Sequence, residues 1–407
     1  MTQYQITLSQ EDLHGLFSGD EGLARLMEKV LNQVLQFEAT EAVGALPYER
    51  TDSRCGYRNG NRDRPLHTRV GSLTLAVPQF RKGGFSTELF ERYQRSEMAL
   101  MLAMMEMVIN GVSTRKVTKI TEELCGTQFS KSTVSALCKK LDPLVCEWNE
   151  RPLGEKCYPF VLMDAIVIKV RKQGRVRSQS IMLSIGINLQ GQREILGIKI
   201  GDSESYESWT EYLSWLKQRG LRGVDLVVSD HHSGLVKAIQ TQFQGAVWQR
   251  CQTHFMRNIL GATPKRLQKE VHSQLKPIFM APDIKTARTL LNSTLATYQD
   301  IAPKAMETLE NGFDDALAVL MLPERYRRKL RTTNLVERLN EEIRRRERVI
   351  RIFPNEESAV RLIGALLLEK DEDWITGRRY MDMTDYIEWK RKEQSKLDSP
   401  ERQLAAD

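Results

Sequence analysis

Three β-type runs in succession constrain the fold of this 407-residue chain more than any other feature. The first, residues 158–168, is almost continuously apolar and is interrupted by the acidic Asp164. Turn sequences at 172–174 and 190–192 separate it from runs at 180–189 and 194–200. Apolar runs divided by Gly-containing turns are typical of an antiparallel meander. We therefore predict a sheet in this part of the chain.

Helices alternate with two short strands after the meander. Aromatic and Leu spacing predicts a helix over 205–219, and a buried strand over 224–228 ends at Ser229-Asp230. A helix from Gly234 and a strand at 246–248 follow. The order βββαβαβ is that of a ribonuclease H-like core, in which helices flank a mixed sheet. We predict a mixed α/β fold of this type.

The predicted catalytic core is divided into two parts. Residues 151–261 form the first part, and 262–331, which lack a strand pattern, form an all-helical insertion. Residues 332–370 supply the C-terminal helices of the core, the last beginning near Asn355. The highly charged residues 371–407 are expected to be a peripheral tail.

Two regions precede this core. Residues 1–95 contain a predicted long helix over 20–45 and a small β-containing segment over 50–95, and we expect DNA end binding or multimerisation there. Several Arg residues make the β segment basic. A solvated loop face explains them as well as DNA contact does.

Residues 96–150 are predicted to be a helix-turn-helix-like DNA-binding domain. A Met-rich helix ends at Asn110-Gly111, a second ends at Leu124, and Ser130 caps a third. The third carries Lys131, Lys139 and Lys140, which we expect to contact DNA. An ordinary helical bundle is the alternative, and the Met side chains are core in both cases.

Composition limits the class of protein. The net charge of +7 is compatible with a polyanionic partner. Six scattered cysteines without a CxxC pair, and no signal peptide, favour reduced thiols in the cytoplasm over a disulfide framework. The chain lacks a run near the roughly 18 apolar residues needed to span a bilayer. We therefore expect a cytosolic protein without a membrane partner.

Two aspartates mark a candidate catalytic site. Asp164 lies inside an apolar strand, where an ionised carboxylate is costly unless it binds a metal or accepts hydrogen bonds. Asp230 follows a buried strand, at the strand end where functional groups gather. A structural Asp and a helix N-cap are the alternatives. In the predicted core the first and fourth strands are neighbours, which brings both carboxylates within reach of one cation.

A third carboxylate lies on a later helix. In residues 332–346, Leu335, Leu339 and Ile343 form the buried stripe, and Glu337 belongs to the neighbouring one. That stripe can present ligand and phosphate contacts together. Alternatively, it is a solvated face with ion pairs.

Three carboxylates suit metal-dependent phosphodiester chemistry. Mg²⁺ takes oxygen ligands and keeps several waters, so a few carboxylates and a substrate phosphate complete its shell. Two ions about 3.5–4 Å apart activate the attacking oxygen and stabilise the leaving one. We expect two Mg²⁺ ions, with Mn²⁺ as a substitute, at Asp164, Asp230 and Glu337.

Basic residues surround the third carboxylate. Residues 325–351 contain eleven Arg or Lys against four Glu, an excess equal to the net charge of the whole chain. Such a segment would grip phosphates beside the metal site. The residues that we expect to bind DNA here are Arg338, Arg344, Arg345, Arg346 and Arg348.

Short motifs in a fixed order resemble those of bacterial Mutator-type insertion-sequence transposases. The motifs are Asp164 in its strand, Ser229-Asp230, Cys251-Gln252-Thr253-His254-Phe255 with Arg257-Asn258, and the segment from Thr332 through Glu337 and Asn340 to Phe353-Pro354. The resemblance extends through nearly the whole chain. One departure is Ala165, where the family often has Gly.

The resemblance implies a ribonuclease H-like core with an Asp-Asp-Glu triad, which falls on Asp164, Asp230 and Glu337. It implies Mg²⁺ or Mn²⁺, recognition of terminal inverted repeats, and a homo-oligomer, a dimer on paired DNA ends. Cys251 and His254 match the family's CxxH signature, and we expect His254 to orient a ligand or touch DNA. Two local donors are too few for zinc. Asn334 and Asn340 are expected to support the triad.

On this interpretation the chain cleaves the ends of an element and joins the free 3′-hydroxyl to target DNA. Two other classes remain open. One is a DNA-binding regulator built on an inactive core, whose mark would be a missing carboxylate. The other is a nuclease of the same fold that only hydrolyses.

Overall fold

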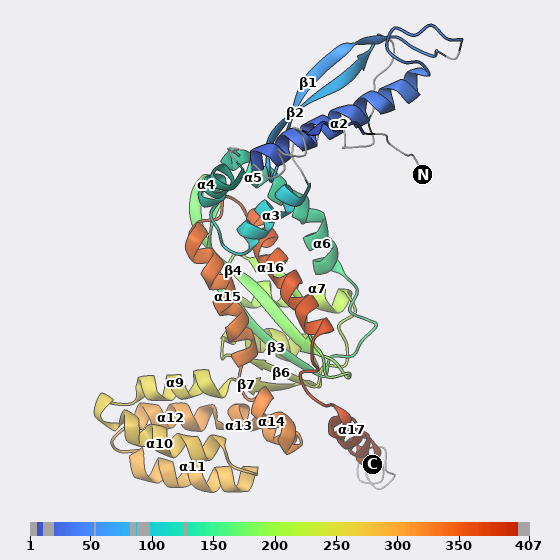
Figure 1. Ribbon diagram of the computed structural model, residues 1–407. Coiled ribbons are helices and arrows are strands. Elements are labelled where there is room, and N and C mark those ends of the chain that lie inside the picture. Colours follow the sequence, from blue (N-terminus) through green and yellow to red (C-terminus); the bar gives the residue numbers. More distant parts are fainter. Residues whose placement is uncertain are drawn as a thin grey trace. The chain divides into compact units, whose positions relative to one another are not determined.

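The computed structural model describes residues 6–10, 20–52, 54–81, 87, 98–125 and 129–397. The chain divides into two compact units, Met1–Lys140 and Leu141–Asp407 (Figure 1). Within the described parts, the helices are too short or too polar to cross a membrane.

The first unit contains a helix with a β-hairpin and a group of three helices. Helix α2 (Asp20–Val43) packs on strands β1 (Arg58–Thr68) and β2 (Gly71–Phe80) through Leu35, Leu73 and Leu75. This arrangement confirms a long helix and a small β segment. The strands pair antiparallel. The part of the β segment at 82–86 and 88–95 lies outside the described residues.

Helices α3 (Met98–Ile109), α4 (Thr114–Cys125) and α5 (Lys131–Cys138) pack around Met101, Met104 and Val134. The Met side chains are therefore core, as predicted. The Ser130 side chain accepts a hydrogen bond from the Thr133 amide and caps α5, which confirms that helix start. A short 3₁₀ helix, η2 (Lys139–Leu141), follows α5. Most of the expected turn at 125–127 lies outside the described residues.

A five-stranded mixed sheet is the centre of the second unit. Its strands are β3 (Phe160–Lys172), β4 (Arg175–Ile187), β5 (Arg193–Gly201), β6 (Leu226–Ser229) and β7 (Val247–Arg250), in the order β5-β4-β3-β6-β7. The first three strands pair antiparallel, and β3, β6 and β7 pair parallel. The predicted meander and the two later strands are confirmed. Gln173 and Gly174, both with positive φ, form the tight turn between β3 and β4.

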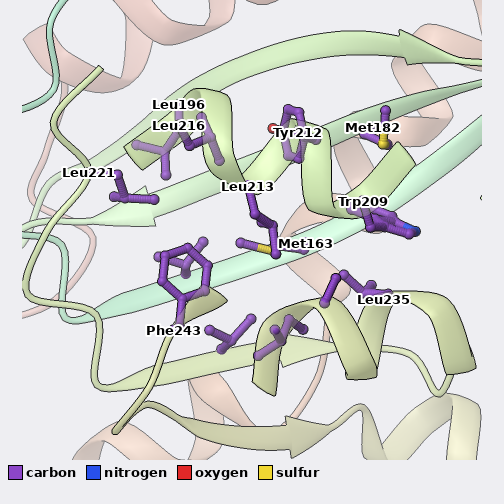
Figure 2. Packing of buried hydrophobic residues seen from close by; sticks show 14 of the residues in the cluster. Met163, Met182, Leu196, Trp209, Tyr212, Leu213, Leu216, Leu221, Leu235 and Phe243 are labelled. Carbon is purple, nitrogen blue, oxygen red and sulfur yellow. The ribbon is translucent and has the colours of Figure 1, made fainter. Parts of the chain in front are cut away.

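Helices α7 (Tyr206–Gln218) and α8 (Ser233–Gln242) cover one face of the sheet. Figure 2 shows Trp209, Leu213 and Leu235 from these helices packed against Met163 of β3. Side chains alternate along a strand, so Asp164 lies on the opposite face. Helices α15 (Asn334–Ile350) and α16 (Glu356–Thr376) contact β3 on that face.

The predicted insertion is helical throughout. Helix α9 (Gln252–Ala262) leads from β7 into it, and α10 (Gln268–Phe279) and α11 (Ile284–Tyr298) lie beside one another in Figure 1. The remaining elements are η3 (Lys265–Leu267), α12 (Pro303–Asn311), α13 (Phe313–Leu317), η4 (Ala318–Met321) and α14 (Glu324–Leu330). Helices α9 to α13, with η3 and η4, share a core that includes Phe255, Ile278 and Phe313.

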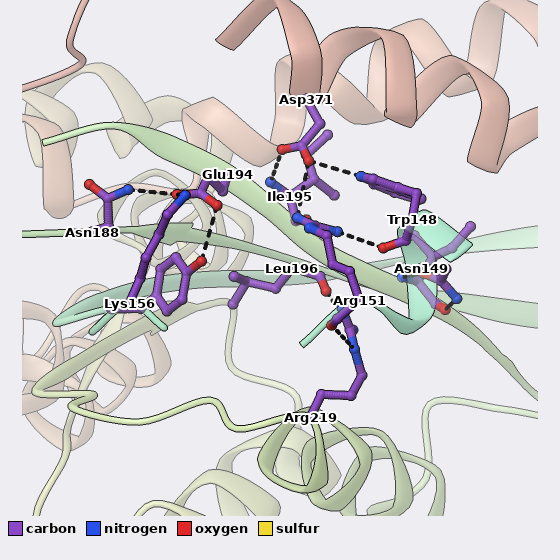
Figure 3. A network of polar contacts seen from close by, with 12 residues as sticks. Trp148, Asn149, Arg151, Lys156, Asn188, Glu194, Ile195, Leu196, Arg219 and Asp371 are labelled. Atoms are coloured by element: carbon purple, nitrogen blue, oxygen red, sulfur yellow. Dashed lines mark hydrogen bonds and ion pairs between the residues drawn. The ribbon is translucent and has the colours of Figure 1, made fainter. Parts of the chain in front are cut away.

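A buried polar network around Asp371 links the start of the second unit, at Trp148 and Arg151, to α16 and β5 (Figure 3). The Asp371 carboxylate on α16 accepts hydrogen bonds from the Trp148 indole at 2.8 Å, the Arg151 guanidinium at 3.0 Å and the Ile195 amide at 2.6 Å. Trp148 lies on α6 (Asp142–Glu150). Helix α6 therefore packs with the sheet, whereas we expected the boundary after residue 150.

The expectation of a peripheral tail from residue 371 does not describe residues 371–397. Asp371 is buried, and α17 (Thr384–Leu397) buries Tyr386 at 1% exposure. The Tyr386 hydroxyl and Lys390 both donate hydrogen bonds to the Asp225 carboxylate, beside β6. The sequence did not predict this packing because the segment is mostly charged, and only a few of its residues, such as Met383 and Tyr386, are buried.

Candidate active site

Parallel pairing of β3 with β6 brings the two aspartates together. Leu162 is the register partner of Val228 in this pair. Two residues further along both strands are Asp164 and Asp230, where β6 has ended. The two carboxylates therefore lie at neighbouring positions at the same edge of the sheet.

The surroundings of Asp164 disfavour its ionised form. Burial raises the pKa of Asp164 to about 7, and the negative charge of Asp230 adds to the rise, whereas a hydrogen bond from the Ala165 amide opposes it. The second carboxylate oxygen accepts a hydrogen bond from the Asn340 amide at 2.7 Å. A cation at this position would remove the unfavourable burial of charge.

Helix α15 brings Glu337 to the same face. Leu335, Leu339 and Ile343 are buried, as the stripe predicted. The Glu337 carboxylate accepts a hydrogen bond from the Thr333 hydroxyl at 3.1 Å and lies 3.6 Å from His254 Nε2. Because Asn340 follows Glu337 by one turn and bonds to Asp164, the helix carries both groups over β3.

Cys251 and His254 border Glu337. Cys251 follows β7 and is fully buried, and its sulfur accepts a hydrogen bond from the Thr333 amide at 3.4 Å and lies 3.2 Å from the Thr333 hydroxyl oxygen. Hydrogen bonding to Cys251 raises the pKa of His254, and the charge of Glu337 adds to this, while burial opposes it. Donor atoms of Cys251, His254 and Glu337 all lie within 4.8 Å of one another.

A hard cation such as Mg²⁺ fits the two aspartates better than it fits the group of Cys251, His254 and Glu337. Asp164 and Asp230 offer carboxylate oxygens, which Mg²⁺ prefers. Cys251 is a soft donor, and its sulfur already contacts Thr333. Glu337 joins Cys251 and His254 as a third possible metal ligand, which lies too far along the chain to be seen in the local CxxH motif. His254 is better placed to orient Glu337 than to hold an ion itself.

A basic cleft of about 490 Å³ opens beside Glu337. Among its lining groups are His254, Asn340, Glu341 and the four arginines Arg257, Arg344, Arg345 and Arg348. Arg344 also donates a hydrogen bond to the Val167 carbonyl of β3 at 2.6 Å. Carboxylates and arginines in one cleft can hold metal ions and phosphate groups together.

In the second unit, the other predicted site residues do not line the basic cleft. Asn334 is exposed at the first position of α15. Burial lowers the pKa of Arg193 and raises the pKa of Tyr380, and the nearby positive charge of Arg338 acts to lower both. The largely buried Arg346 side chain forms an ion pair with Glu342 at 2.6 Å. In the first unit, three predicted DNA-binding residues are exposed at α5 and η2: Lys131, Lys139 and Lys140.

The structure adds three residues that sequence reasoning missed. Thr333 is buried and links Cys251 to Glu337, and Arg257 extends the basic cleft onto α9. Glu204, between β5 and α7, has a pKa raised by burial, with a contribution from the charge of Asp230. Thr333 and Arg257 lie within motifs of the family resemblance, whereas Glu204 carries no pattern that marks it.

Comparison with known proteins identifies the family of the chain. Residues 1–377 match the family model described as transposase, Mutator family, and the chain belongs to that family. It is 46% identical over 388 residues to the transposase for insertion sequence element IS256 in transposon Tn4001 of Staphylococcus aureus, covering 94% of this chain and 99% of the relative.

A second relative is the transposase for insertion sequence element ISRM5 of Rhizobium meliloti, 45% identical over 92% of this chain and 94% of the relative. A third, the transposase for IS406 of Burkholderia multivorans, is 39% identical over 90% of this chain and 95% of the relative. The resemblance seen in the sequence is therefore confirmed, and the family implies an activity that cleaves and transfers DNA.

Proposed function

We propose that the chain binds the terminal inverted repeats of an insertion sequence, cleaves DNA at the element ends and joins the freed 3′-hydroxyl to target DNA. Its catalytic groups are Asp164, Asp230 and Glu337. The observation that carries this proposal is the pairing of β3 with β6, which aligns the two aspartates beneath the helix of Glu337.

The second unit is proposed to be a ribonuclease H-like core with a helical insertion. Three antiparallel strands followed by two parallel ones, in the order β5-β4-β3-β6-β7, support this assignment. The insertion lies between β7 and α15, with its own hydrophobic core. The three helices α3, α4 and α5 are proposed to bind DNA through Lys131, Lys139 and Lys140.

Mg²⁺, or Mn²⁺ in its place, would be held by the three carboxylates. When bound, two such ions supply Lewis-acid stabilisation of the attacking and leaving oxygens. The chain's own groups then perform the positioning. Asn340 fixes the Asp164 carboxylate, His254 and Thr333 orient Glu337, and the arginines of the cleft hold the phosphates on either side of the scissile bond.

We propose a dimer that binds paired DNA ends. The substrate would be bacterial chromosomal DNA, so the chain would act in the cytosol. No covalent enzyme intermediate is required, because each step is an in-line displacement at phosphorus.

The test is incubation of the full chain with labelled element ends, target DNA and Mg²⁺. We expect joined products from the wild type and none from Asp164→Asn, Asp230→Asn or Glu337→Gln, each of which still binds ends. Glu307→Gln is the matched control, because Glu307 is exposed on α12, lies outside the basic cleft and should tolerate the change.

Each alternative predicts a different product. A nuclease of the same fold would release cleaved ends without joined DNA. A regulator with an inactive core would bind the ends and leave them intact. Full strand transfer by any one of the three variants would remove that residue from the site.

A further inference from the structure

A second cleft, here called the α9–α10 cleft, opens beside the candidate active site. Its volume is about 390 Å³, and its apolar lining consists of Met256, Leu260, Phe279 and Met280. Phe279 is buried and packs against Phe255, with 5.9 Å between the ring centroids, within the core of the insertion. The floor of the cleft is thus apolar, and Phe279 connects it to the hydrophobic core of the insertion.

Cationic groups surround this apolar floor. Arg257, His272, Lys276 and Arg331 line the cleft, and the Arg331 guanidinium donates to the Met280 sulfur at 2.9 Å. Met280 is 61% exposed, so its apolar surface is accessible to a ligand that enters the cleft. An apolar floor within a positively charged rim suits a ligand with a flat apolar body and anionic flanks.

The α9–α10 cleft adjoins the basic cleft that Glu337 lines. Arg257 lines both the α9–α10 cleft and the basic cleft beside Glu337. Thr332 lines the α9–α10 cleft, and the next residue, Thr333, donates a hydrogen bond to Glu337. A phosphate held by Arg257 would therefore lie between the carboxylates and the apolar floor.

We propose that the α9–α10 cleft receives a single nucleobase that leaves the stack next to the scissile phosphate. This inference rests on the proposed function, because it takes DNA as the substrate. Arg257 and Arg331 would hold the phosphates that flank the displaced base, and Met280 and Phe279 would supply the apolar contact. The volume lies near the lower end of the roughly 300–1,000 Å³ typical of small-ligand pockets, which suits one flat ring system.

Holding the base aside has a chemical consequence. An unstacked nucleotide frees its backbone to turn, so that the scissile phosphate can approach the carboxylates in line with the attacking oxygen. Aromatic and apolar contact tolerates every base because each has a π-face. The α9–α10 cleft would therefore act on element ends regardless of the base at that position.

The experiment uses the full chain and duplexes copied from the ends of the element that encodes it. 2-Aminopurine is placed in turn at each position around the cleavage site, and its fluorescence is followed as protein is added without divalent metal. We expect a rise at one position only, because the probe fluoresces more strongly when it leaves the stack. Met280→Glu should remove the rise by bringing a negative charge into the apolar lining, beside Arg331.

Two variants control for folding and for charge. Met280→Leu keeps the apolar contact and should keep the rise. Ile301→Glu places the same charge at a residue of the insertion that is 46% exposed and outside the α9–α10 cleft, and it should also keep the rise. In Mg²⁺, Met280→Glu should cleave about 10-fold more slowly, and an abasic site at the responsive position should restore most of that loss.

Several results would overturn the inference. These are a wild type that cleaves ends with no rise at any position, a Met280→Glu variant equal to wild type, or an equal loss in Ile301→Glu. In each case the proposed function survives because end cleavage is still observed. A wild type that neither binds nor cleaves the ends overturns both proposals.

Discussion

The buried carboxylate of Asp164 destabilises the folded sheet when it is ionised. Burial raises its pKa from 3.8 to about 7, so the folded chain binds a proton that the unfolded chain releases between these values. For a carboxyl group with a raised pKa, stability is highest below the unfolded pKa and falls as the pH rises towards the folded pKa. The metal-free protein should therefore lose stability between about pH 4 and pH 7 through this residue.

Asp164→Asn should consequently stabilise the metal-free protein at pH 8. We expect a gain of about 2 kcal/mol in the free energy of unfolding, after allowing for partial solvent access, and almost none at pH 4. Urea denaturation in a chelator at both pH values measures this difference. The exposed Asp300→Asn is the control. Equal or lower stability of Asp164→Asn at pH 8 would show that the carboxylate is not destabilising.

Asn340 should act as a positioning residue for Asp164. Asn340→Ala removes the 2.7 Å hydrogen bond to the carboxylate while it leaves the three proposed ligands in place. We expect strand transfer to slow by roughly 10–100-fold, with a higher Mg²⁺ concentration needed for half-maximal rate and end binding unchanged. Asn334→Ala, at an exposed position of the same helix, should change neither quantity. A loss of rate that Mg²⁺ concentration does not affect would indicate a purely structural role.

At the scale of elements, the buried Asp371 carboxylate links α16 to α6 and to the sheet. Asp371 accepts hydrogen bonds from α6, from Arg151 and from β5, and is 2% exposed. Asp371→Ala leaves these donors without a partner and should lower the free energy of unfolding by about 3 kcal/mol. Asp373→Ala, on the same helix with a side chain 60% exposed, should cost less than about 0.5 kcal/mol.

Urea denaturation of both variants at neutral pH makes this comparison. If Asp371→Ala matches Asp373→Ala, the network of Figure 3 does not hold α16 to the sheet. If both variants lose several kcal/mol, the effect belongs to the helix in general and not to the buried acceptor.

Sequence patterns predicted most elements but not all their neighbours. The strand runs and turns around Gly174 and Gly191 were visible because side-chain alternation and positive-φ turns are local properties. The position of α6 and the docking of α17 were not, since Trp148 and Tyr386 bond to Asp371 and Asp225, more than a hundred residues away. Local periodicity carries no information on such partners.

At the scale of the whole molecule, each of the two compact units has hydrophobic clusters of its own. We therefore expect the fragment 141–407 to fold without residues 1–140 and to unfold in one cooperative transition. The same fragment should lose its preference for terminal repeats over random DNA, because Lys131, Lys139 and Lys140 are absent from it. Circular dichroism in urea and competition binding measure the two properties.

The control for this prediction is the full chain under identical salt, since phosphate contacts depend strongly on ionic strength. A fragment that keeps full preference for the repeats would move end recognition into the second unit. A fragment without a cooperative transition would show that the first unit is needed for its fold.

The sequence by itself determined the mixed sheet, the helical insertion, the family, and Asp164 and Asp230 as candidates, because these depend on short-range patterns and on motif order. Only the tertiary structure decided which acidic side chain of α15 lies beside His254. Glu337, Glu341 and Glu342 fall within two turns of one helix, and packing against β3 and α9 places Glu337 there, while Glu341 is exposed and Glu342 pairs with Arg345 and Arg346. The apolar α9–α10 cleft likewise exists only in the folded chain, since its walls come from segments that no local pattern connects.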